Sequence, residues 1–101
     1  MNMQQMMAQA QKMQRELKKA QAELAQKEFV VSKGGAVTVT VLGNKEIKSI
    51  IIDKDAFDAE NKEMVQDLIV MGINELQEKI ETAKEELNEK ITGSRGGFGG
   101  F

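Results

Sequence analysis

The sequence predicts an α+β fold: a long helix, a three-stranded antiparallel meander and a second long helix, with the two helices forming a projecting arm. Three observations support this prediction. Apolar residues follow a heptad over residues 1–27, valine and threonine alternate over residues 37–41, and a helical period returns over residues 60–91. The chain has 101 residues, enough for one domain. We assign this domain to residues 1–92 and treat residues 93–101 as a tail.

The segment before the strands, residues 1–27, is predicted to be helical because it contains no glycine, proline or β-branched residue. Its apolar residues form one narrow seam, as in a coiled coil. A helix of about 25 residues is about 37 Å long, more than a small domain covers from end to end. We therefore expect a projecting arm. The seam consists of Met3, Ala10, Leu17 and Leu24 at the a positions and Met6, Met13 and Ala20 at the d positions.

The middle of the chain predicts three short strands. Residues Glu28–Lys33 are β-prone, and Ala36–Leu42 alternates apolar and polar side chains. Gly34-Gly35 and Gly43-Asn44 each indicate a two-residue hairpin turn. The third strand, Lys45–Ile52, ends with apolar residues on both faces, so we expect a helix or a partner chain to cover its second face.

A polar connector, Asp53–Asn61, leads into the second helix, which we expect from about Glu60 to about Ile91. Asp55, Asp58 and Asn61 are candidate helix caps. The first turns of this helix are broadly apolar, as in a helix buried under a sheet or in a dimer. Its later turns carry a narrow seam.

The two narrow seams are expected to pack antiparallel. In the simplest register Leu24 lies near Ile69, Leu17 lies near Leu76 and Ala10 lies near Ala83. The same register brings Glu16 close to Lys79. The outer face of the second helix is expected to be acidic, with Glu75, Glu78, Glu81, Glu85 and Glu89.

Composition argues against several classes of protein. Aromatic residues make up only 4% of the chain, so the core must be aliphatic. The chain has no cysteine and no histidine, which removes the commonest nucleophile–base pairs and metal ligands. It shows neither a signal peptide nor an apolar run long enough to span a bilayer. We therefore expect a cytoplasmic protein with no catalytic residues, no cofactor and no metal.

The charges are distributed unevenly. The net charge is −2, but residues 1–52 carry eight basic and four acidic side chains, whereas residues 53–101 carry six basic and twelve acidic ones. Such asymmetry indicates a local basic surface. The candidate DNA-binding residues lie on the first helix, on the side away from the seam: Lys12, Arg15, Lys18 and Lys19, which we call the basic stripe. The alternative is an ordinary solvated helix face.

Two other clusters have simpler explanations. Asp53, Asp55, Asp58 and Glu60 lack the glycine and the distal glutamate of a calcium loop, so caps and turns explain them better than a metal site. The methionines of the first helix are better explained by packing along the seam than by a soft-metal site or a peptide-binding surface. Residues 93–101 contain five of the nine glycines and are predicted to be disordered.

Three stretches taken together resemble the bacterial YbaB/EbfC family of nucleoid-associated DNA-binding proteins: QQMMAQAQKMQ, GGAVTVTVLGNKEIKSIIID and VQDLIVMGINE. The similarity covers residues 3–91, nearly the whole chain. It implies a homodimer of α-β-β-β-α protomers with helical arms that project like tweezers, and DNA binding in the nucleoid without catalysis. The tail departs from the family's usual pattern because it contains no proline. No residue-level binding motif is transferred, so the site residues come from the charge pattern.

The resulting interpretation is a homodimeric nucleoid-associated protein that binds double-stranded DNA largely non-specifically and contributes to nucleoid organisation and gene regulation. It implies no membrane partner and no small-molecule substrate. The main alternative is a protein–protein interaction module, either a coiled-coil adaptor or a chaperone-like clamp, whose binding would tolerate salt. An enzyme would need a carboxylate or lysine centre in a pocket that the sequence does not suggest.

Overall fold

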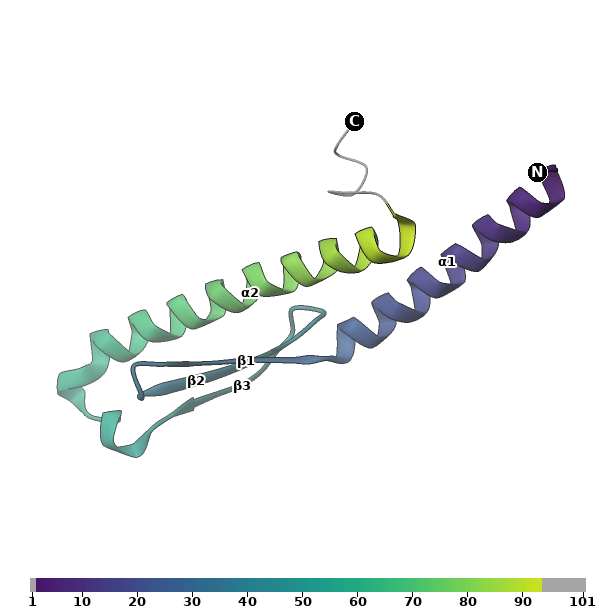
Figure 1. Ribbon diagram of the computed structural model, residues 1–101. Helices are drawn as coiled ribbons and strands as arrows, with labels where there is room; N and C mark the ends of the chain where they lie inside the picture. The colour runs from purple at the N-terminus through teal and green to yellow at the C-terminus, as the bar shows by residue number, and fades with distance from the viewer. Residues whose placement is uncertain (1, 94–101) are drawn as a thin grey trace.

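The computed structural model describes residues 2–93 and confirms the predicted α+β architecture. One helix, one antiparallel sheet in the order β1-β2-β3, and a second long helix follow one another along the chain (Figure 1). Two short 3-10 turns, η1 and η2, connect the sheet to the second helix. The elements are α1 (Met3–Gln26), β1 (Glu28–Lys33), β2 (Val37–Leu42), β3 (Ile47–Ile52), η1 (Lys54–Ala56), η2 (Ala59–Asn61) and α2 (Lys62–Thr92).

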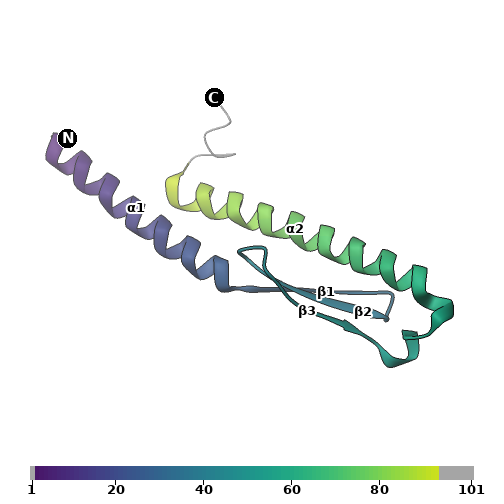
Figure 2. The ribbon, with the colours of Figure 1, turned by 180° about the vertical axis from the view of Figure 1, so that it is seen from behind.

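Helix α1 has a well-defined start. The Asn2 side chain accepts a hydrogen bond from the Gln5 backbone N–H at 2.8 Å, and the Gln5 side chain accepts one from the Asn2 N–H at 3.4 Å. This capping box satisfies two N–H groups that would otherwise have no partner in the helix. None of the residues of α1 is buried in the protomer. As Figure 2 shows from behind, α1 runs away from the sheet, and its N-terminal part passes beyond the end of α2.

The sheet is a meander with a regular β1–β2 register, from Glu28 opposite Leu42 to Lys33 opposite Val37. Gly34 and Gly35 both have positive φ, 59° and 66°, but the predicted two-residue turn is too short by one residue, because Lys33 pairs with Val37 and Ala36 also belongs to the loop. The predicted two-residue turn at Gly43-Asn44 is wrong, because a third residue, Lys45, also belongs to the loop. Lys45 has φ 74°, and the Leu42 N–H donates to the Glu46 carbonyl across the loop.

Helix α2 covers one face of the sheet, and the core lies between them (Figure 1). This core is aliphatic, as the composition predicts, and its largest fully buried side chains are Val37, Val39, Val41, Leu76 and Ile80. Gly72 allows the close approach: a Cβ at this position would lie 3.1 Å from Cγ2 of Val39.

The predicted packing register of the two helices is wrong. Leu24 lines a hollow together with Leu87, about 18 residues beyond the expected neighbour Ile69, and Leu76 is packed in the core under the sheet. The reason is that α2 must first cross the sheet, whose six-residue strands are each about 20 Å long. Only the C-terminal turns of α2 remain to pack against α1. Lys79 consequently pairs with Glu75, at 3.6 Å, and not with Glu16.

The junction between α1 and the sheet depends on Gly43. The Gly43 N–H donates to the Lys27 carbonyl at 2.9 Å, and the Asn44 N–H donates to the Ala25 carbonyl at 3.1 Å. A Cβ on Gly43 would lie 1.7 Å from the Leu24 carbonyl oxygen. The β2–β3 loop thus caps the end of α1, and it fixes the direction in which the arm leaves the sheet.

The connector is held by its own acidic side chains. Asp53 accepts from the Asp55 N–H, and Asp58 accepts from the Glu60 N–H, so each caps a short 3-10 turn. Asp58 was predicted as a cap, whereas Asp55 is not one and Asn61 donates to the Ala56 carbonyl instead. Helix α2 ends at Thr92, and Gly93 caps it with φ 70°. The remaining residues of the predicted disordered tail, 94–101, lie outside the described residues. Across residues 2–93, no helix is long and apolar enough to cross a membrane.

Candidate nucleic-acid interface

The basic stripe lies on the exposed side of α1. Lys12, Arg15, Lys18 and Lys19 are all solvent-exposed. Their spacing of three, three and one residues places them on one side of the helix, over a length of about 10 Å. Four cationic side chains therefore form a continuous exposed row along one helix.

The half-buried residues of α1 show which way the stripe points. Leu17, Ala20 and Leu24 are the seam residues that lose exposure, and Leu24 lines a hollow together with Leu87 of α2. Because each residue turns the helix by about 100°, the stripe lies on roughly the opposite side. It therefore faces away from α2 and from the acidic side chains on that helix.

Ion pairing removes most other basic groups of the N-terminal half from consideration. Lys33 pairs with Glu75 at 2.6 Å, Lys45 pairs with Glu81 at 2.5 Å, and Lys48 pairs with Glu28. Within residues 2–93, no carboxylate lies within 4.0 Å of a cationic nitrogen of the basic stripe. The unpaired positive charge of this half of the chain is thus concentrated on α1.

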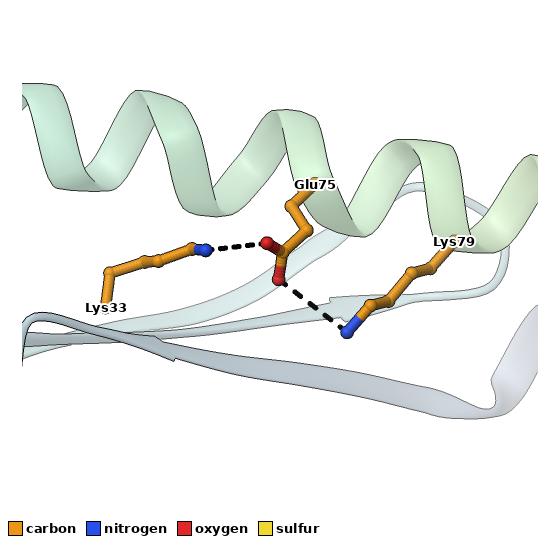
Figure 3. A network of polar contacts seen from close by, with 3 residues as sticks. All are labelled: Lys33, Glu75 and Lys79. Atoms are coloured by element: carbon orange, nitrogen blue, oxygen red, sulfur yellow. Dashed lines mark hydrogen bonds and ion pairs between the residues drawn. The ribbon is translucent and has the colours of Figure 1, made fainter.

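Two glutamates expected on the outer acidic face pair with lysines outside α2: Glu75 pairs with Lys33 of β1, and Glu81 pairs with Lys45 of the β2–β3 loop. Figure 3 shows Glu75 between Lys33 of β1 and Lys79 of α2. The hydrogen bond from Lys33 is the main reason that the pKa of Glu75 lies below its usual 4.5, against the opposing effect of partial burial. The hydrogen bond from Lys45 likewise lowers the pKa of Glu81. The prediction of an outer position for Glu75 is therefore wrong, whereas Glu78 and Glu85 are exposed.

The other candidate clusters are the acidic residues of the connector and the methionines of α1. No group of three or more acidic side chains in the described part of the chain is arranged to hold a metal ion. The four exposed methionines of α1 all lie beyond the part of the helix that α2 covers, and three of them belong to the seam: Met3, Met6 and Met13.

Comparison with known proteins gives this geometry a context. The model of the YbaB/EbfC DNA-binding family matches residues 1–95. The chain belongs to the YbaB/EbfC DNA-binding family. Its similarity to individual members of this family extends over nearly the whole length of both chains.

Three relatives illustrate this similarity, and each is named a nucleoid-associated protein. The protein from Ruminiclostridium cellulolyticum is 43% identical over 99% of this chain and 88% of its own length. The Clostridium novyi protein is 47% identical over 97% of this chain and 84% of its own length. The Enterococcus faecalis protein is 43% identical over 96% of this chain and 94% of its own length. The resemblance inferred from the sequence is thereby confirmed.

Two features of the interface could not be predicted from the sequence pattern. The role of Gly43 in orienting α1 depends on a contact between segments about 20 residues apart, and the only signal was a glycine in a turn. The second feature is the uncovered N-terminal half of the seam. Heptad spacing predicts a seam, but it does not give the length over which the second helix covers it.

Proposed function

We propose that this protein binds double-stranded DNA through the basic stripe of α1, largely without sequence preference. In doing so it contributes to nucleoid organisation and gene regulation. The observation that carries the proposal is the row of four exposed cations, unpaired within residues 2–93, in a chain whose net charge is −2. Membership of a DNA-binding family supports the same conclusion.

The chemistry of the stripe favours the phosphate backbone over the bases. Lysine and arginine neutralise phosphates and release counterions, which gives affinity without sequence information. The stripe contains no aromatic side chain on which an unpaired base could stack, and none of the four phenylalanines of the chain lies in α1. Duplex DNA is therefore the expected partner, in preference to single strands.

The proposed active form is a homodimer. An apolar hollow of about 340 Å³ lies at the end of the sheet far from the arm, lined by Ile52, Phe57, Val65 and Ile69 among others. Phe57, which lines this hollow, is 79% exposed, and Ile50 on the edge strand β3 is 40% exposed. Exposed apolar surface of this kind is typical of protein interfaces. A dimer joined here would carry two arms, and sedimentation showing a stable monomer at micromolar concentration would refute it.

The DNA-binding proposal is tested by two variants with equal charge changes. One replaces the four basic-stripe residues by glutamine. The control replaces four exposed lysines outside α1 by glutamine: Lys48, Lys54, Lys62 and Lys79. Glutamine preserves helix propensity, and loss of exposed ion pairs has little effect on stability.

In a gel-shift titration against random duplex DNA, the stripe variant is expected to lose about a hundredfold or more in affinity at low salt, whereas the control should remain within about threefold of the wild type. Circular dichroism should show the same helix content for all three proteins. Equal losses of affinity in both variants would show that binding depends on net charge and not on the position of the cations. No loss of affinity in either variant would mean that the basic stripe is an ordinary solvated helix face. Salt-tolerant binding to a protein with no DNA binding would favour the interaction-module alternative.

A further inference from the structure

The seam of α1 continues beyond the point where α2 ends. Leu24 and Ala25 line a hollow together with Leu87 and Asn88. Because the two helices run antiparallel, each residue toward the N-terminus of α1 is level with about one residue further toward the C-terminus of α2. On this basis Thr92, the last residue of α2, lies level with about residue 19 of α1. The exposure pattern agrees, because Leu17 and Ala20 are half-buried while residues 2–16 are all exposed.

The uncovered part of α1 is an unusual surface for a solvated helix. Met3 is 76% exposed, Met6 57% and Met13 39%. No side chain from Asn2 to Gln11 is charged; this segment contains only methionine, glutamine, alanine and the capping asparagine. Solvent-exposed helix faces usually carry charged side chains, whereas this segment combines an apolar seam, as in helices that pack against one another, with no charged side chain on any face.

The free segment of α1 would be stabilised by a partner. About 14 residues of α1 project without tertiary support, and isolated helices of this length are marginally stable in water. The capping box at Asn2 nevertheless defines where the helix begins. A second helix packed along the seam would supply the missing support.

The seam is complementary to itself. If two copies of the segment pack antiparallel, the a positions of one copy meet the d positions of the other. Met3 then faces Met13 of the second copy, and Ala10 faces Met6, so a large side chain meets a small one near the centre. The flanking Gln9 and Gln14 are neutral, so no like charges oppose each other across the contact.

We propose that the free tips of two α1 helices, residues 3–13, associate antiparallel through Met3, Met6, Ala10 and Met13. This contact is separate from the dimer surface at Phe57, which lies at the other end of the molecule. The contact is short, so it forms only transiently in free solution. Its population becomes significant where the local concentration of arms is high. The basic stripes remain on the outer sides of the paired tips. If the proposed DNA binding holds, on which this consequence rests, paired tips join two DNA-bound molecules.

Disulfide trapping tests the contact without DNA, because the wild-type chain has no cysteine and each variant carries a single thiol. Met6→Cys and Ala10→Cys in separate copies would face each other. The control is Ala8→Cys, which places the same small residue on the opposite side of the helix. Under mild oxidation, an equimolar mixture of M6C and A10C should cross-link about tenfold faster than a mixture of M6C and A8C.

Equal rates in the two mixtures would overturn the proposal, and so would M6C alone cross-linking fastest, since that indicates parallel packing. Cross-linking that appears only after truncation at Gly93 would also overturn it, by showing that residues 94–101 occupy the seam. Sedimentation of the cross-linked mixture should give a species larger than the uncross-linked protein. An unchanged size would show that the tips pair within one dimer and would contradict the joining of molecules.

The consequence for DNA is measured with Met6→Gln combined with Met13→Gln, which keeps all four cations. Protein bound to an immobilised duplex should capture a second, labelled duplex, and the double variant should lose most of this capture while binding the first duplex as the wild type does. If wild-type protein fails to bind the first duplex, the proposed DNA binding fails, and the cross-linking result stands independently. Equal capture by wild type and variant would contradict the role of the tips.

Discussion

Substituting Gly43 by alanine tests whether the β2–β3 loop holds the arm in place. The added Cβ would lie 1.7 Å from the Leu24 carbonyl oxygen and 2.6 Å from the Leu24 carbonyl carbon. Both atoms belong to the backbone, so no side-chain rotation relieves the clash. The loop must move away from α1, and the hydrogen bonds from Gly43 to Lys27 and from Asn44 to Ala25 are lost or weakened.

The expected effect is large for a surface loop. Each backbone hydrogen bond contributes about 1 kcal/mol net, and steric strain adds to the loss of two, so G43A should destabilise the protein by about 2–4 kcal/mol. For a domain of this size, 1 kcal/mol corresponds to about 4–8 °C in Tm. Thermal denaturation followed by circular dichroism at fixed protein concentration should therefore show a decrease of about 10–25 °C.

The matched control is Gly35→Ala in the other hairpin turn. A Cβ added to Gly35 would meet open space, but this residue has φ +66°. The G35A variant is therefore expected to lose only about 1–2 kcal/mol of stability, through backbone strain. A G43A protein that melts within a few degrees of the wild type, or higher than G35A, would refute the reasoning that this junction orients the arm.

Three further predictions concern the packing of α2 on the sheet. Leu76→Ala should reduce the free energy of unfolding by about 2–5 kcal/mol because Leu76 is fully buried, whereas Met71→Ala, at a site 53% exposed, should change it by less than about 1 kcal/mol; urea denaturation measures both. Gly72→Leu should reduce the free energy of unfolding by about 3 kcal/mol or prevent folding, because Val39 and Val31 lie within 3.4 Å of the position that a Cβ would occupy. A urea midpoint equal to that of the wild type would contradict the close approach of α2 to the sheet. Glu75→Gln should be less stable than the wild type at neutral pH. The lowered pKa of Glu75 means that its contribution is fully present above its ordinary pKa of 4.5 and is lost as the pH falls through the lowered pKa, so the two stability curves should converge on acidification. A constant difference would argue against the Lys33 interaction.

The sequence predicted well those features that depend on local pattern. Heptad spacing, strand alternation and paired glycines give the order of the elements, and the boundaries of α1 and β1 agree within two residues. The aliphatic core follows from the near absence of aromatic residues. The exposed position of the basic stripe also follows from helical periodicity, because residues opposite an apolar seam face solvent.

The features that were missed depend on distances between elements. Leu76 and Leu87 are indistinguishable as seam residues, yet one lies in the core under the sheet and the other lies beside Leu24. Which of them meets α1 is decided by the length of sheet that α2 must cross first. Glu75 was misplaced for a similar reason, since its partner Lys33 is 42 residues away in sequence and lies at the end of β1. The role of Lys45 in the second turn depends on a left-handed backbone conformation that lysine rarely adopts.

The salt dependence of binding to duplex DNA tests the central claim most directly. If the basic stripe binds phosphates, a plot of log K against log salt concentration should have a slope of about −3.6 for one arm with four contacts and about −7 for two arms. Random and unrelated duplex sequences should give the same slope, with affinities that differ little. A slope near zero would show that binding does not depend on phosphate neutralisation, and it would contradict the assignment of the stripe as the DNA-binding surface.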